Sequence, residues 1–153
     1  MQPSQPLPKW ISWGILFLAV IGFADAAYLS AKHFQGETPT CILFSGCDVV
    51  TTSAYSTIGP VPIALLGSLF YLSVLILVLY YLDKKDARAM RLLSWIAVPG
   101  FLFTFYLLYL QAFVLDAWCI YCVASAVSSI SIFSLSQLGR HRLRDVVPIM
   151  SQN

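Results

Sequence analysis

Four long apolar stretches run through this chain of 153 residues and largely decide what it can fold into. A helix needs about 20 apolar residues to cross a hydrocarbon core of about 30 Å, and residues 10–31, 60–82, 92–115 and 117–138 reach that length. The first stretch contains one charged residue, Asp25, and the other three contain none. Backbone groups in lipid must be satisfied within their own segment, which favours helices. We therefore predict an all-α membrane protein, a bundle of four transmembrane helices in a lipid bilayer.

The composition supports this class and argues against others. Hydrophobic residues make up 59% of the chain and charged residues 10%, whereas soluble domains average about 25% charged residues. The net charge is only +2, and no block of basic residues is interleaved with aromatic ones. We therefore expect no nucleic-acid partner.

The basic residues predict the orientation of the segments. Most of them lie before the first segment, between the second and third, or after the fourth: Lys9, Lys84, Lys85, Arg88, Arg91, Arg140, Arg142 and Arg144. The other side holds Lys32 with Glu37, Asp48 and Asp116. Basic loops usually face the cytoplasm. We therefore predict a multi-pass protein of the cell membrane with both termini in the cytoplasm.

One membrane domain accounts for most of the chain. We expect residues 10–138 to form this domain, residues 1–9 to be a disordered cytoplasmic leader, and residues 139–153 to be a basic cytoplasmic tail. A rival interpretation takes the sequence Ala24-Asp25-Ala26 as the cleavage site of a signal peptide. The apolar run continues beyond that site and only one lysine precedes it, so we favour a membrane helix.

The four cysteines form two closely spaced pairs, and both pairs fall on the predicted extracytoplasmic face. Cys41 and Cys47 are spaced C-x5-C in the first connection, and Cys119 and Cys122 form a C-x-x-C that opens the fourth segment. Disulfides persist on that side of the membrane. The first turn of a helix has free N–H groups and the positive end of the helix dipole, and both stabilise a thiolate. The pattern favours a relay of dithiols, and a relay that ends in a membrane needs a lipid-soluble electron acceptor such as a quinone.

Two structural alternatives stay open for these cysteines. They can form static disulfides in a non-enzymatic membrane scaffold, although closing such short loops stabilises a fold only weakly. They can also bind one metal ion as four thiolates, although an oxidising face disfavours four reduced thiols. We prefer the oxidoreductase and expect no metal site.

The first extracytoplasmic connection, residues 32–59, is long enough to hold structure of its own. Residues 47–56 contain few helix breakers and predict a short half-helix at the membrane interface that covers the bundle. We expect Asp48 to cap this half-helix. Asp25 is a candidate for proton or quinone chemistry because a carboxylate inside a membrane segment is costly. We expect His33 to be a solvated loop residue.

Several short motifs together resemble the vitamin K epoxide reductase family. They are Cys41-x5-Cys47-Asp48, then Ser53, then Gly59-x-Val61-Pro62-x-Ala64-x-x-Gly67, then Tyr71, and finally Trp118-Cys119-Ile120-Tyr121-Cys122. The resemblance is to the bacterial branch without a fused thioredoxin-like domain, and it spans about residues 10–138. It implies a four-helix bundle around a quinone, covered by a half-helix from the first outer loop.

The resemblance also implies a role for individual residues. Cys119 and Cys122 become the pair that reduces the quinone, with Cys122 nearer the ring. Cys41 and Cys47 become the shuttle pair that meets a separate extracytoplasmic thioredoxin-like oxidase. Ser53 matches a hydroxyl position near the active cysteines and is expected to contact the quinone. The implied cofactor is a quinone, menaquinone or ubiquinone, and the implied activity is quinone-dependent thiol–disulfide oxidoreduction that supports disulfide-bond formation.

The chain departs from the animal members of that family at two positions. Ala126 stands where they have a tyrosine, one turn beyond the C-x-x-C, and Ile63 stands where they have a polar residue near the start of the second helix. Both replacements remove a hydrogen-bond donor. We therefore expect quinone reduction without efficient epoxide reduction.

Overall fold

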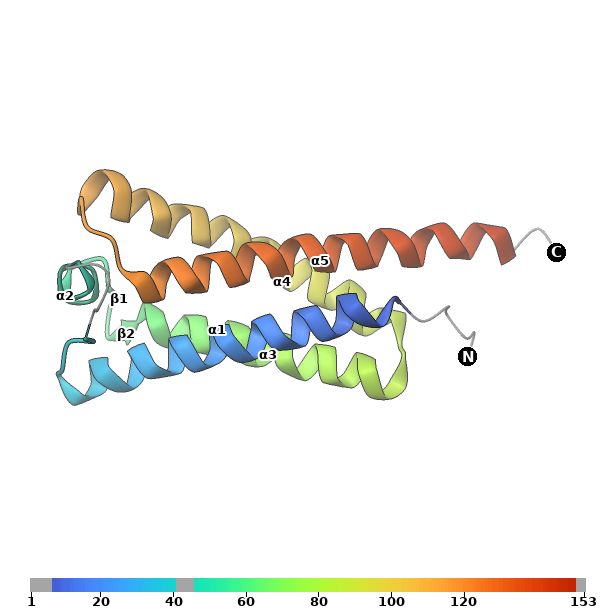
Figure 1. The fold of residues 1–153 in the computed structure, drawn as a ribbon, viewed down its shortest axis with the longest axis horizontal. Helices are drawn as coiled ribbons and strands as arrows, with labels where there is room; N and C mark the ends of the chain where they lie inside the picture. Colours follow the sequence, from blue (N-terminus) through green and yellow to red (C-terminus); the bar gives the residue numbers. More distant parts are fainter. Residues whose placement is uncertain (1–6, 41–45, 151–153) are drawn as a thin grey trace.

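The computed structural model describes residues 7–40 and 46–150, with side chains as far as residue 143. Four long helices dominate this part of the chain (Figure 1): α1 (Lys9–Gln35), α3 (Ile63–Lys84), α4 (Ala87–Tyr109) and α5 (Ile120–Met150). A short π-helix, η1 (Leu110–Val114), prolongs α4. Within the described residues, four helical stretches are long and apolar enough to cross a membrane. This confirms the predicted class of fold.

The helices pack mainly through α1, which lies against α3 and α5, while α4 lies against α5 and α3. The buried core consists of aliphatic side chains and two tyrosines: Ile11, Ile15, Ala19, Tyr71, Val74, Val78, Tyr81, Leu93 and Ile132. Gly22 lets α1 and α3 approach closely, because a Cβ there would lie 2.3 Å from the ring of Tyr71. Small residues allow such contacts between membrane helices.

Hydrogen bonds between helices hold the end of the bundle that carries the termini. The hydroxyl of Ser94 in α4 donates to the carbonyl of Ser136 in α5 at 3.0 Å, and the amide of Gln137 donates back to the carbonyl of Ser94 at 3.2 Å. The backbone N–H of Leu7 donates to the hydroxyl of Tyr81 at 3.0 Å. Polar side chains are used in this way where no water is present to satisfy them.

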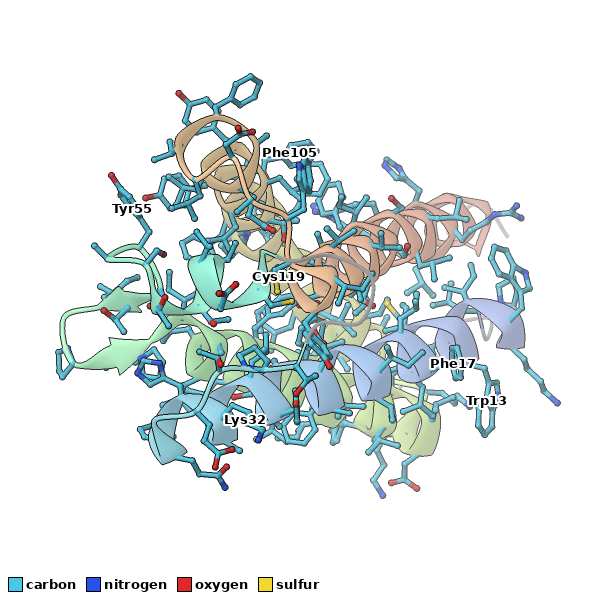
Figure 2. The ribbon with its side chains drawn as sticks, turned by 60° about the vertical axis from the view of Figure 1, so that its left-hand side comes forward. Trp13, Phe17, Lys32, Tyr55, Phe105 and Cys119 are labelled. Atoms are coloured by element: carbon cyan, nitrogen blue, oxygen red, sulfur yellow. The ribbon has the colours of Figure 1, made fainter. Side chains whose placement is uncertain are left out.

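The outer surface of the bundle is apolar. Figure 2 shows Trp13 and Phe17 pointing away from the bundle, and Leu69, Ile76 and Trp95 are exposed on other helices. A soluble domain rarely exposes so much contiguous apolar surface. We therefore expect this apolar surface to contact lipid.

A small cap covers the end of the bundle opposite the termini (Figure 1). It consists of α2 (Cys47–Thr52) and a two-stranded hairpin, β1 (Thr57–Ile58) and β2 (Val61–Pro62). In the hairpin Thr57 pairs with Pro62, and Ile58 pairs with Val61. The turn contains Gly59 with a positive φ of 62°, which glycine adopts at little cost.

The predicted half-helix is confirmed, but it is shorter than expected, and its predicted cap is wrong. It ends at Thr52 because Ser53 is extended and its carbonyl accepts the N–H of Ser56 in a turn. Gly46 is the N-cap, and no side chain caps the helix. Asp48 instead occupies the first turn, where a negative charge favours the helix dipole.

Candidate active site

The C-x-x-C pair sits at the start of α5. Cys119 directly precedes the helix, and its carbonyl accepts the N–H of Val123 at 3.0 Å. Cys119 is fully buried, whereas Cys122, one turn further, is half-buried. Figure 2 shows Cys119 in the interior of the bundle, next to α2. Both residues are free thiols.

Hydrogen bonds to its sulfur make Cys119 the better thiolate of the pair. The Cys122 thiol donates to the Cys119 sulfur, and this lowers the pKa of Cys119 below the usual thiol range, to about 7. The backbone N–H groups of Tyr121 and Cys122 act in the same direction, while burial opposes them. These backbone donors are the free N–H groups of a helix start, as the sequence predicts. The lowered pKa makes Cys119 suited to thiol–disulfide exchange, in which the thiolate is the reacting form.

Gln111 fixes the backbone of Cys119. Its side-chain oxygen accepts the Cys119 N–H at 3.2 Å in a buried position, and its own carbonyl accepts the N–H of Ala117 at 3.1 Å. Gln111 lies in η1, and π-helical turns are frequent at functional sites. Sequence reasoning missed this residue. A signal was present, because Gln111 is the one side-chain amide in the apolar stretch 92–115.

Of the loop pair Cys41 and Cys47, Cys47 belongs to the described residues and Cys41 lies outside them. Cys47 begins α2, is buried and is disulfide-bonded. Its neighbour Gly46 touches the backbone beside the C-x-x-C: a Cβ on Gly46 would lie 2.8 Å from the nitrogen and 2.9 Å from the carbonyl oxygen of Trp118. The residues that follow Gly46 and Trp118 are Cys47 and Cys119. The fold thus brings the start of α2 against the start of α5.

A second contact joins the same two segments. The hydroxyl of Tyr121, within the C-x-x-C, donates to the carbonyl of Thr40 at 3.1 Å. The Tyr121 ring also packs against Tyr28 of α1, with centroids 5.3 Å apart. Thr40 is the last described residue before Cys41. The outer loop is therefore tied to the C-x-x-C at both Thr40 and Gly46.

A cavity of about 410 Å³ lies next to the thiol pair. All four long helices and the cap contribute to its lining, which is mostly apolar and includes Ala26, Leu29, Val50, Ile63, Gly67, Phe70, Pro99, Phe103, Leu107 and Ala126. Cys122 lines the cavity. Ser53 lines it as well, although its hydroxyl donates to the carbonyl of Val50 at 2.9 Å. Ile63 and Ala126, where the resemblance leads us to expect a difference from animal family members, both line this space.

Two polar atoms in the wall have no partner. Among the described residues, Oδ2 of Asp25 and Oγ of Ser129 are buried without a hydrogen bond, and both residues line the cavity. An apolar cavity with a few polar groups is typical of small-molecule sites. A quinone head group has a flat apolar ring and two polar oxygens, so the chemistry of this lining fits it.

Two further predictions concern His33 and metal binding. His33 is exposed as expected, but it lies in the last turn of α1 and lines the cavity instead of belonging to a loop. The described residues contain no group of three or more His, Cys, Asp or Glu side chains that is placed to hold a metal ion. The alternative four-thiolate site includes Cys41, outside the described residues.

Comparison with protein families agrees with this geometry. Residues 13–137, which include all four long apolar stretches in whole or in large part, match the model of the vitamin K epoxide reductase family. The members of this family are membrane oxidoreductases that act on thiols and quinones. The match covers far more than half of the 153 residues and contains both cysteine pairs. The chain belongs to the vitamin K epoxide reductase family.

Proposed function

We propose that the protein transfers two electrons from a thioredoxin-like protein outside the membrane to a membrane quinone, and so supports disulfide-bond formation. The partner reduces the disulfide of Cys41 and Cys47. This pair then reduces a disulfide of Cys119 and Cys122 by thiol–disulfide exchange. The resulting dithiol reduces the quinone, which is menaquinone or ubiquinone.

The contact between Gly46 and Trp118 carries this proposal. Exchange between two pairs requires a thiolate to attack a disulfide sulfur directly. The contact sets the residues before Cys47 and Cys119 backbone against backbone, and this supports direct exchange between Cys47 and the inner pair. Cys47 is buried at this junction. We therefore assign Cys47 to the exchange with the inner pair and Cys41 to the partner protein.

The position of Cys122 supports quinone as the electron acceptor. Cys122 lines the apolar cavity beside its buried neighbour Cys119. A redox reaction between a thiol and a quinone requires the sulfur to lie close to the ring in a suitable orientation. Ser53 lines the same space, and we assign it a contact with the quinone.

The distribution of charge supports an extracytoplasmic position for the cysteines. The α3–α4 connection lies at the end of the bundle with the termini, opposite the cap (Figure 1); Lys84 is the last residue of α3, and Lys85 follows it in this connection. Basic residues favour the cytoplasmic side. An impermeant amine reagent is therefore expected to spare both lysines in intact cells and to label them after permeabilisation.

Trapping of a mixed disulfide tests the proposal against the alternative of a scaffold with two structural disulfides. Cys47→Ala leaves Cys41 without its resolving thiol, so a covalent complex with an extracytoplasmic thioredoxin-like protein should accumulate. Cys41→Ala is the matched control and should give little complex. A static scaffold predicts no trapped partner with either variant. That result would contradict the relay.

A further inference from the structure

Asp25 is a charged residue in the cavity wall that the relay alone does not use. It lies in α1, lines the cavity, and has one buried oxygen without a hydrogen-bond partner among the described residues. It is close enough to Cys119, Cys122 and Tyr71 to interact with each electrostatically. Leaving a buried carboxyl group unpaired is costly. A carboxyl group kept inside a membrane helix at such a cost is a candidate for a functional role.

The other polar side chains that line the cavity are less suited to exchanging protons. The hydroxyls of several donate to backbone carbonyls, namely Thr51, Ser53, Ser56, Tyr71 and Thr104. Ser129 has an unpaired hydroxyl, but a hydroxyl is a poor base at neutral pH. His33 is exposed in the last turn of α1. Among the described lining residues, Asp25 is the one carboxyl group.

Reduction of a quinone by the Cys119 and Cys122 thiols needs a group in the cavity that can carry a proton. Oxidation of the two thiols to a disulfide releases two electrons and two protons, and reduction of a quinone to a hydroquinone consumes both. The pKa of Cys119 is lowered, so this thiol can lose its proton before the quinone is reduced. The proton of Cys122 is held against the Cys119 sulfur, so it must be removed within the site before Cys122 can react.

We infer that Asp25 carries a proton from the Cys122 thiol to the quinone oxygen, an inference that rests on the proposed function. The Asp25 carboxylate accepts the Cys122 proton as that sulfur reacts. Cys119 and Cys122 then close their disulfide, and the two electrons pass to the quinone. The Asp25 carboxylic acid gives its proton to one oxygen of the product, and water supplies the second proton. In the balanced net reaction, one dithiol and one quinone give one disulfide and one hydroquinone.

Several titratable groups face Asp25 and enter its pH dependence. Tyr71 approaches from α3, and Tyr121 and Cys122 approach from α5, with Cys119 directly before it. On α1 itself, His33 lines the same cavity. Measurements above about pH 8 keep most of Cys119 in the thiolate form, because its pKa is about 7, so they report mainly on the step that involves Cys122.

The test is a single turnover of the full-length, pre-reduced protein in lipid nanodiscs, mixed with a short-chain ubiquinone. Asp25→Asn should slow quinone reduction by about 10²-fold or more. Its rate should rise with pH, because hydroxide must replace the missing base. Asp25→Glu should recover the wild-type pH profile. Asp116→Asn makes the same chemical change at an exposed carboxylate of the same end of the bundle and should leave the rate unchanged.

Quinone affinity, measured by quenching of tryptophan fluorescence, provides the readout that does not depend on turnover. Asp25→Asn should bind the quinone as well as wild type does. The inference is overturned if Asp25→Asn reacts within about threefold of wild type, if its pH profile is unchanged, if Asp25→Glu fails to recover that profile, or if lost binding accounts for its slow rate. A wild-type protein that never reduces the quinone would instead contradict the proposed function itself.

Discussion

The α-carbon of Gly46 packs against the backbone of Trp118, so that no side chain fits between the cap and the start of α5. A Cβ at position 46 would lie 2.8 Å from the Trp118 nitrogen. This distance is shorter than carbon and nitrogen atoms tolerate, and backbone is the part of the neighbour that yields least. The contact brings the residue before Cys47 against the residue before Cys119, and the proposed electron relay depends on it.

Replacing this glycine should uncouple the two cysteine pairs. Gly46→Ala is expected to displace α2 and to lower turnover driven by a thioredoxin-like partner by about tenfold or more, since small misplacements of reacting groups are expensive. Turnover driven by a small dithiol that reduces Cys119 and Cys122 directly should be unaffected. Turnover is measured separately with the thioredoxin-like partner and with the small dithiol as electron donor.

Gly14→Ala is the matched control. A Cβ at position 14 would approach only the end of the Leu135 side chain, at 3.3 Å, which can move aside. Partner-driven turnover of this variant should equal that of wild type. If Gly46→Ala lost the same share of turnover with the partner protein and with the small dithiol, the substitution would have damaged the fold generally and would not have uncoupled the two cysteine pairs.

The acidity of Cys119 should depend on Cys122. In a reduced protein with Cys41→Ala and Cys47→Ala, the thiolate absorbance should rise with pH around a midpoint of about 7. Adding Cys122→Ala removes the thiol that donates to the Cys119 sulfur, while burial remains, so the midpoint should move to higher pH. An unchanged midpoint would show that the backbone N–H groups alone lower the pKa.

Gln111 should position the active cysteine without taking part in the chemistry. Gln111→Leu leaves the buried N–H of Cys119 unpaired, which should cost about 1–3 kcal/mol in the free energy of unfolding. Gln111→Glu keeps an acceptor but adds a negative charge near the thiolate, so it should raise the pKa of Cys119. Thermal unfolding and thiolate titration check the two expectations. If Gln111→Leu left the free energy of unfolding unchanged and Gln111→Glu left the pKa of Cys119 unchanged, the positioning role of Gln111 would be wrong.

Substrate choice should follow from Ile63 and Ala126. Opening an epoxide requires protonation of its oxygen, and neighbouring donors assist that step. Both residues line the cavity and neither has a donor, so the proton for the epoxide oxygen would have to come from Asp25, the one carboxyl group among the described lining residues. We expect the purified protein with a dithiol donor to reduce menaquinone readily and menaquinone epoxide poorly or not at all. Comparable rates with both substrates would show that another group supplies the proton.

The sequence was sufficient to predict the parts of the fold that depend on local patterns. Apolar length located all four membrane helices, and a stretch free of helix breakers located α2. The hairpin escaped prediction because its strands have only two residues each, too few to show an alternating pattern. The end of α2 was misplaced because Ser53 turns the chain by backbone hydrogen bonds that composition does not reveal.

Long-range contacts account for the features of the site that the sequence did not predict. The spacing of Cys119 and Cys122 predicts an activated thiolate at a helix start, and the lowered pKa of Cys119 agrees with it. Nothing in the spacing relates Gln111 to Cys119, Gly46 to Trp118 or Tyr121 to Thr40, because each contact depends on how separate segments pack. Asp25 could be singled out as an unusual charge, but only the packed bundle shows that it faces the cavity.

Coupled turnover in a purified system tests the central claim most directly. The protein in nanodiscs would be supplied with a reduced thioredoxin-like partner and a quinone, and both partner oxidation and hydroquinone would be followed. The account predicts one hydroquinone for each partner dithiol oxidised, and loss of this flow in Cys47→Ala, Cys119→Ala and Cys122→Ala, each of which remains folded. Partner oxidation that continues at the wild-type rate in any of these variants would contradict the relay.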